Sequence, residues 1–102
     1  MLVTAPDMEV AERLAGALVE DGLATCVSLV PSVTSIYRWE SAVQRASEVL
    51  MIVKGTVDGF ENLRRRVVEL HPYDVPEVIE LDVRDGSPDY LEWVKNGVRE
   101  KS

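Results

Sequence analysis

Val49-Leu50-Met51-Ile52-Val53 is an unbroken apolar run near the middle of the chain. In an extended strand, Val49, Met51 and Val53 point to one side of the sheet, and Leu50 and Ile52 point to the other. A strand that is apolar on both faces is typical of the centre of a sheet that is covered on both sides. We therefore expect this run to be a central strand, and the rest of the fold to be arranged around it.

Upstream of this run, the spacing of apolar residues changes from strand to helix and back. Residues 2–4 read as a short first strand, and Asp7 is a suitable N-cap for a helix over residues 8–21. Residues 24–40 then read as a long strand. Pro31 cannot donate a hydrogen bond to a neighbouring strand, so it marks a bulge, a bend or an edge position.

Downstream, the same alternation is repeated. The polar residues 41–47 suit a hairpin connection, and residues 58–70 have helical spacing. Residues 78–83 alternate as a strand is expected to. The residues of this strand that are predicted to point inward are Ile79, Leu81 and Val83. A last helix is predicted after Ser87-Pro88, because a serine N-cap followed by proline is a strong helix start.

The order of elements is strand, helix, strand, strand, helix, strand and an extra helix. Right-handed crossovers place both main helices on one face of a four-stranded sheet. The predicted fold class is therefore α+β, a ferredoxin-like βαββαβ sandwich with an additional C-terminal helix, in a single domain over residues 1–102. Two helices cover only one sheet face, so we expect self-association to cover the other.

Composition narrows the classes of function. The chain has 11 Lys and Arg against 18 Asp and Glu, for a net charge of −7. This balance argues against nucleic acid as a partner, because such binders concentrate basic residues. No apolar stretch is long enough to span a bilayer and no signal peptide is visible, so no membrane partner is expected. Cys26 is the only cysteine, which excludes an intramolecular disulfide and favours a reducing cytoplasm.

The segment His71-Pro72-Tyr73-Asp74-Val75-Pro76-Glu77 holds the only histidine of the chain. Its two prolines make it a stiff connector, which fixes the directions of its side chains. His71 and Glu77 are the candidate metal ligands, because imidazole and carboxylate suit divalent cations. Two other interpretations remain open: the segment is only a helix stop and strand start, and His71 is only a charge that complements the helix dipole.

A second set of residues is predicted to line a cleft between subunits. Its members are Tyr37, Trp39, Glu40, Glu48, Lys54 and Tyr73. The aromatic residues either line a ligand site or simply pack in an interface. Lys54 is expected to pair with a carboxylate, as an interface ion pair or as an anchor for an anion. Cys26 either packs as a small hydrophobe or binds a soft metal.

No enzyme is predicted. The single histidine has no serine or cysteine motif near it, and the chain has no glycine-rich phosphate loop.

Five segments together resemble one known family. They are Thr4-Ala5-Pro6-Asp7, Leu23-Ala24-Thr25-Cys26-Val27, Val33-Thr34-Ser35-Ile36-Tyr37-Arg38-Trp39-Glu40, the His71–Glu77 connector, and Pro88-Asp89-Tyr90-Leu91-Glu92-Trp93. Their order and spacing are similar to those of the CutA family of divalent-cation tolerance proteins, over essentially the whole chain. The resemblance implies a ferredoxin-like fold, a tight homotrimer held by strand pairing, a cytoplasmic location in bacteria, and binding of copper or another divalent cation.

The sequence departs from the family pattern at its described copper site. In such members, a cysteine before the Thr-Ala-Pro-Asp segment and paired histidines before Pro-Tyr supply the ligands, but this chain has Val3 and Leu70-His71 there. Ser41 also replaces a usual glycine, and Gly55 a usual threonine.

Two hypotheses follow. The first is a cytoplasmic homotrimer that binds divalent metal ions and supports metal homeostasis. The alternative is a trimeric signalling or adaptor protein that binds a small anionic metabolite in its inter-subunit clefts.

Overall fold

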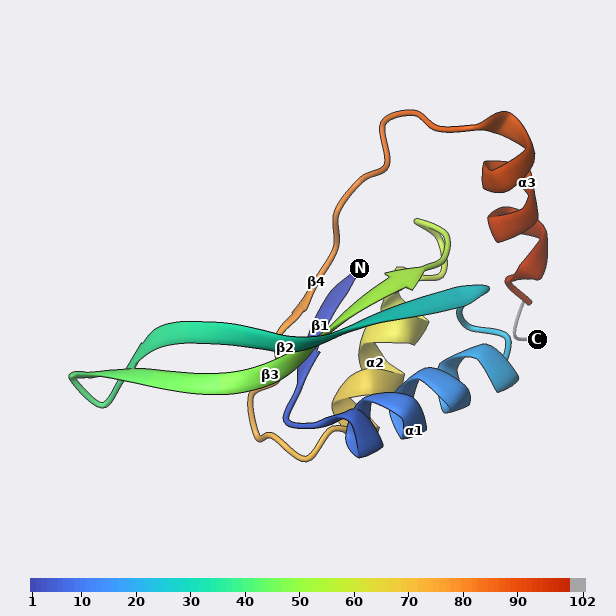
Figure 1. Cartoon of the computed structure of the whole chain (residues 1–102). Helices are drawn as coiled ribbons and strands as arrows, with labels where there is room; N and C mark the ends of the chain where they lie inside the picture. Colours follow the sequence, from blue (N-terminus) through green and yellow to red (C-terminus); the bar gives the residue numbers. More distant parts are fainter. Residues whose placement is uncertain (100–102) are drawn as a thin grey trace.

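The computed structural model describes residues 1–99 and shows a four-stranded antiparallel sheet with strand order β2-β3-β1-β4 (Figure 1). The elements, in chain order, are β1 (Leu2–Ala5), α1 (Met8–Glu20), β2 (Cys26–Trp39), β3 (Ala42–Lys54), α2 (Phe60–Leu70), β4 (Val78–Ile79) and α3 (Pro88–Gly97). This order and topology confirm the ferredoxin-like fold with an additional C-terminal helix. None of the helices in this part of the chain is long and apolar enough to cross a bilayer.

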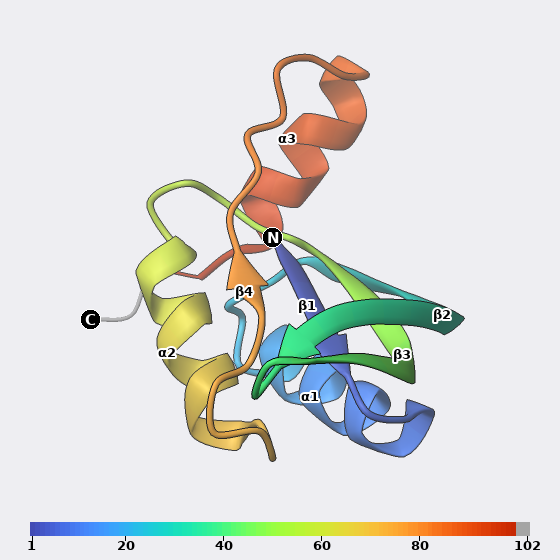
Figure 2. The same ribbon diagram turned by 90° about the vertical axis from the view of Figure 1, so that its left-hand side faces the viewer.

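The core lies between the sheet and the two main helices, which cover the same face (Figures 1 and 2). From the sheet, Val3 and Met51 are fully buried. They face Leu14 of α1 and Val67 of α2 within one contiguous cluster. The chain thus buries one face of its central strand by helix packing, which is where most of the apolar area leaves water.

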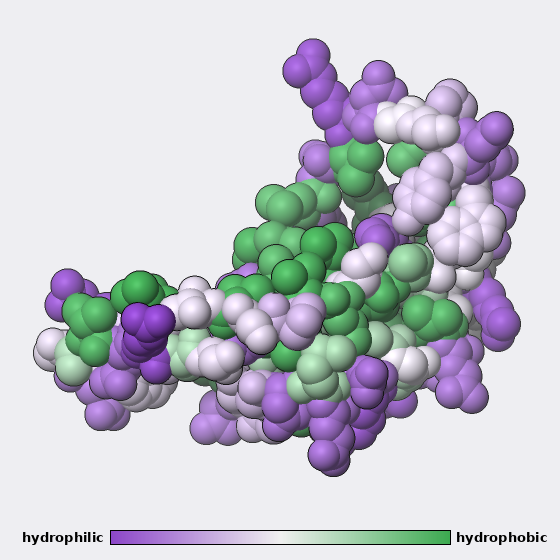
Figure 3. Space-filling model, in the orientation of Figure 1, coloured by the Kyte–Doolittle hydropathy of each residue, from purple (hydrophilic) through white to green (hydrophobic). Residues whose placement is uncertain are grey.

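The opposite face of the sheet carries no such layer. Leu50 and Ile52, whose side of the sheet is predicted to be covered by self-association, are only half-buried within the chain. Figure 3 shows hydrophobic side chains gathered on this side, between α3 and the segment that follows β4. We refer to this side of the sheet, which carries Leu50 and Ile52, as the open face. One chain therefore covers only one of the two apolar sides of its central strand.

Asp7 caps α1 as predicted. Its side chain accepts a hydrogen bond from the Val10 amide at 2.9 Å, which satisfies one of the free amides of the first turn. The helix ends before Gly22, whose φ of 74° lies in the left-handed region that glycine adopts without strain. This sharp exit returns the chain toward the sheet at β2.

β2 and β3 form a long two-stranded arm that projects beyond the sheet, here residues 33–48 (Figure 1). A register shift between Val30 and Val33 interrupts the pairing around Pro31, and β2 is an edge strand of the sheet. Of the three alternatives for Pro31, an interruption of the pairing and an edge position therefore both apply. The prediction of a loop over residues 41–47 is wrong. Only Glu40 and Ser41 form the turn, both with positive φ, as a two-residue hairpin turn requires.

β4 is much shorter than the predicted strand over residues 78–83. It pairs with β1 only through Leu2–Ile79 and Val3–Val78. β1 begins at Leu2, so later residues have no strand beside them on that edge within the chain. The predicted inward direction is also wrong: Ile79, Leu81 and Val83 are exposed, whereas Val78 packs against the core. This extended segment leaves apolar side chains without cover.

α3 is attached to the rest of the molecule mainly at its C-terminal end. The Thr25 hydroxyl donates to the Val94 carbonyl, and the Arg99 amide donates to the Gly22 carbonyl at 2.8 Å. A Cβ on Gly97 would meet the Thr25 side chain at 2.4 Å, so only glycine permits this close approach. The predicted start of α3 is confirmed, because Ser87 is its N-cap residue and Pro88 is its first helical residue.

Candidate functional site

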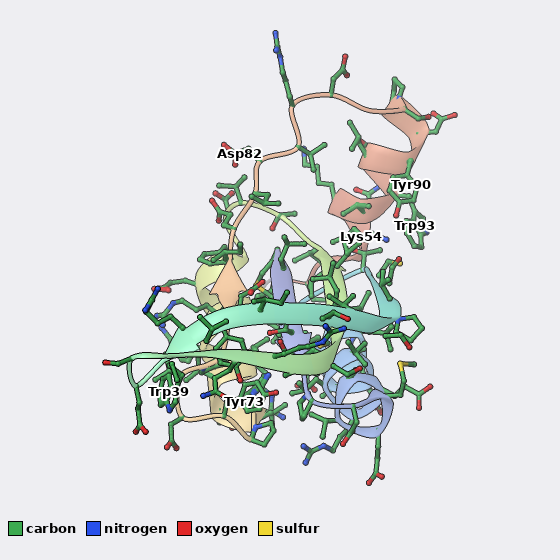
Figure 4. The ribbon with its side chains drawn as sticks, turned by 60° about the vertical axis from the view of Figure 1, so that its left-hand side comes forward. Trp39, Lys54, Tyr73, Asp82, Tyr90 and Trp93 are labelled. Atoms are coloured by element: carbon green, nitrogen blue, oxygen red, sulfur yellow. The ribbon has the colours of Figure 1, made fainter. Side chains whose placement is uncertain are left out.

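The cavity that collects most of the predicted site residues has a volume of about 420 Å³. It is lined by Thr4, Tyr37, Trp39, Glu48, Tyr73, Asp74, Val75 and Glu77. We call it the acidic aromatic pocket. Three parts of the chain build it: β1, one face of the arm, and the connector that follows α2. Trp39 and Tyr73 lie on the same side of the arm in Figure 4.

The arm contributes residues by strand alternation. In β2, Tyr37 and Trp39 are two positions apart and therefore share a face. Glu48 of β3 pairs with Val33, which belongs to the same alternating set. The connector supplies the facing wall. It bends over residues 72–75 and is held to β1 by the hydrogen bond between His71 and the Thr4 carbonyl.

Tyr73 links the connector to the arm. Its hydroxyl donates a hydrogen bond to the Glu48 carboxylate, with 3.0 Å between the two oxygens. Burial of the phenol raises the pKa of Tyr73 to about 12, and the hydrogen bond to Glu48 and the charge of that carboxylate add to the effect. At neutral pH the phenol is therefore a fixed donor that orients Glu48.

His71 lies behind the pocket and is buried, with 7% of its surface exposed. Its Nε2 donates to the Thr4 carbonyl at 2.7 Å, and its Nδ1 accepts the Tyr73 amide hydrogen at 3.1 Å. This pattern requires the neutral imidazole with its proton on Nε2. The ring also packs against Tyr73, with 4.7 Å between ring centroids. His71 thus ties the connector to β1.

The charge of the lining is one-sided. Glu48, Asp74 and Glu77 contribute carboxylates, and no lysine or arginine of residues 1–99 lines the pocket. Side chains of like charge around a low-dielectric wall create a local negative potential. The pocket is therefore built to attract cations and to repel anions.

The family model of the CutA1 divalent ion tolerance protein matches residues 1–97. The chain belongs to this family. The divalent-cation tolerance protein CutA of Thermus thermophilus is 47% identical over 95 residues, which cover 93% of this chain and 92% of that protein.

Solved CutA structures share the fold. The crystal structure of CutA1 from Oryza sativa gives a TM-score of 0.95 at 44% identity, covering 98% of this chain and 92% of that one. A structure described as the periplasmic divalent cation tolerance protein CutA from Archaeoglobus fulgidus gives 0.92 at 35% identity, covering 96% and 95%.

For this CutA1-family chain, the predicted metal pair His71 and Glu77 does not come together in one chain. Glu77 lines the pocket, but both ring nitrogens of His71 are engaged with the backbone and offer no lone pair to a metal. Within residues 1–99, no group of three His, Cys, Asp or Glu residues lies close enough to hold a metal ion. The residues of one chain therefore do not fit a tight metal site.

The predicted cleft residues divide into two groups. Tyr37, Trp39, Glu48 and Tyr73 line the pocket, whereas Glu40 sits in the hairpin turn and is not part of the lining. Lys54 is at the other end of β3, close to α3 (Figure 4).

Within one chain, Lys54 contacts a hydroxyl and a thiol. Its ammonium donates to the Ser28 hydroxyl at 2.5 Å and lies 3.7 Å from the Cys26 sulfur. The predicted carboxylate partner is absent from its neighbours in the described part of the chain. Cys26 sits directly opposite Lys54 on the adjacent strand, which explains this contact.

Sequence reasoning did not assign Thr4, Asp74 or Val75 to the site. Asp74 and Val75 belong to the connector, so the proline-rich spacing was the available signal for them. Thr4 reaches the pocket only because β1 pairs with β3 through Thr4 and Leu50, which depends on strand register.

Proposed function

We propose that this chain is a cytoplasmic homotrimer that binds divalent cations, copper among them, and thereby supports metal tolerance. The observation that carries the proposal is the lining of the acidic aromatic pocket, with three carboxylates and no basic side chain of the described residues. Carboxylate oxygens are ligands for divalent cations. The role is binding rather than catalysis, because the only histidine is held in hydrogen bonds to the backbone.

Binding is expected to be weak in an isolated chain. The three carboxylates do not converge into a cluster that could hold a metal ion. Water or a carboxylate of a neighbouring chain would have to complete the coordination. The family's tolerance name and the carboxylates of the lining support a divalent cation as the ligand class. The donor oxygens of Glu48, Asp74 and Glu77 are the candidate ligands.

Apolar surface supports the homotrimer. Ile36 and Val43 on the arm are each 68% exposed, and Leu81 lies exposed in the unpaired segment after β4. Such surface favours association between chains. A strand of the protruding arm in one chain could pair with the unpaired segment after β4 in another chain.

An anionic metabolite is a less favourable ligand for this pocket. Glu48, Asp74 and Glu77 would repel it, and its predicted anchor Lys54 borders a different cavity beside α3. The charge of the lining therefore favours the cation over the alternative.

Calorimetric titration of Cu(II) tests the proposal. Glu48→Gln and Glu77→Gln should each weaken binding at least fivefold, because each removes a charged donor. Glu12→Gln, on the exposed surface of α1, is the matched control and should bind like the wild type. Unchanged binding in both pocket variants would overturn the site.

Two cellular measurements test the remaining parts. Fractionation of the native host should recover the protein with cytoplasmic markers, and recovery with the periplasm would contradict the location. Deletion of the gene should lower the copper concentration that stops growth, and the wild-type gene should restore it.

A further inference from the structure

We infer that the acidic aromatic pocket is a site for a small organic cation with an alkylammonium group. The inference rests on the proposed function, in that the pocket must admit cations, and it names a second class of cation. A metal site made of carboxylates has no need for aromatic walls. This pocket has three aromatic walls beside its carboxylates. An alkylammonium is the kind of cation that interacts with both, through its charge and through its alkyl groups.

The aromatic walls are not buried in the core of the chain. Within the chain, Trp39 is 59% exposed and Tyr37 is 46% exposed, so neither ring is consumed by the core. Together with Tyr73 they line the same cavity. The faces of aromatic rings attract organic cations, with tryptophan the strongest, and their apolar surface also accepts methyl and methylene groups.

The carboxylates supply the counter-charge. Glu48 is fixed by the Tyr73 hydroxyl at 3.0 Å, so one acid is already oriented before a ligand arrives. Asp74 and Glu77 stand on the rigid connector in the same lining. Charge complementarity thus selects a cation over a neutral molecule of the same shape.

The size and support of the pocket also fit a small molecule. A volume of about 420 Å³ lies within the range of small-ligand sites. His71 is a positioning residue here: through the Thr4 carbonyl and the Tyr73 amide it holds the connector wall against β1. A pre-formed wall lowers the cost of ordering the site on binding.

Fluorescence of Trp39 gives a direct test. The chain has two tryptophans, so Trp93→Phe leaves Trp39 as the only one. Choline is titrated into this variant, with 3,3-dimethylbutan-1-ol as its neutral isostere, at constant ionic strength. Choline should change the fluorescence saturably and bind at least tenfold tighter than the alcohol, because only choline has a charge.

Substitutions then separate this inference from the proposed metal site. In the Trp93→Phe background, Tyr37→Leu should weaken choline binding at least fivefold more than it weakens Cu(II) binding, because it removes an aromatic face and no charged donor. Glu77→Gln should weaken both ligands. Tyr90→Leu on α3 is the matched aromatic control and should affect neither. Circular dichroism shows whether each variant is folded, and Tyr37→Ile, which suits a strand and also lacks an aromatic face, replaces Tyr37→Leu if the latter is not.

Three results would overturn the inference: no saturable response to choline, equal binding of choline and the alcohol, or unchanged choline affinity in the Tyr37 variant. Loss of Cu(II) binding in Glu77→Gln alongside any of these would leave the proposed metal function standing. Choline binding without Cu(II) binding would support the organic cation and contradict the metal function.

Discussion

His71 joins two backbone segments that are distant in the sequence, and it does so with both of its ring nitrogens. Replacing it with alanine removes the partner of the buried Thr4 carbonyl and that of the partly buried Tyr73 amide. An unsatisfied buried group costs about 1–3 kcal/mol. We expect His71→Ala to lower the free energy of unfolding by about 2 kcal/mol, measured by urea denaturation. His71→Gln, which keeps a donor and an acceptor, should lose less. Equal stability of His71→Ala and the wild type would contradict this role.

Tyr73 should make stability depend on alkaline pH. The folded protein raises its pKa from 10.0 to about 12, so folding favours the neutral phenol. Its contribution to stability is therefore complete below pH 10 and is lost as the pH rises through about 12. In a titration of phenolate absorbance, one of the three tyrosines should ionise late, and Tyr73→Phe should remove that step. Tyr90→Phe is the control. A late step that survives in Tyr73→Phe would assign it to another tyrosine.

The site was predictable from sequence where strand alternation and proline stiffness determine side-chain direction. Alternation placed Tyr37 and Trp39 on one face, and the connector brought Tyr73 and Glu77 to it. Lys54 does not reach this pocket within one chain, because it stands six residues beyond Glu48 on the same strand face, about 20 Å away at strand rise. The engagement of His71 was not predictable, since it depends on how the connector docks against β1.

At the scale of elements, the apolar periodicity predicted the helices and the central strand correctly, but it did not predict the bounds of the strands at the edges of the sheet. Residues 78–83 have the alternating pattern of a strand, yet a strand forms only where a partner strand lies beside it. β1 supplies just two paired residues, so β4 is limited to Val78 and Ile79. The polar composition of residues 42–47 suggested a loop, because both faces of the projecting arm are exposed and neither requires apolar residues. Pairing across the arm, rather than burial, makes it a strand.

The attachment of α3 gives a test at this scale. A Cβ on Gly97 would lie 2.4 Å from the Thr25 side chain, so Gly97→Ala forces α3 away from the sheet. Overpacking of this kind costs about 1–3 kcal/mol. We expect a lower melting temperature and faster hydrogen exchange in α3.

Gly16→Ala is the matched control for this variant. Nothing lies within 4 Å of its Cβ position, and the residue is in the middle of α1. Alanine is a better helix former than glycine, so the control should gain about 0.5–1 kcal/mol. If Gly97→Ala were as stable as this control, the close approach would not limit the docking of α3.

At the scale of the whole molecule, one chain leaves an incomplete structure: the open face, the exposed arm and the unpaired segment after β4 all need cover. A closed ring of three chains would satisfy them together, because each chain both offers an arm and presents an unpaired edge. Light scattering at low micromolar concentration should give about three times the chain mass of 11.4 kDa.

Ile36→Asp combined with Val43→Asp should dissociate the trimer, since charges would enter a contact between chains. Val68→Asp, on the exposed surface of α2, should leave it intact. A stable, soluble wild-type monomer would contradict both the trimer and any cation site completed by a neighbouring chain.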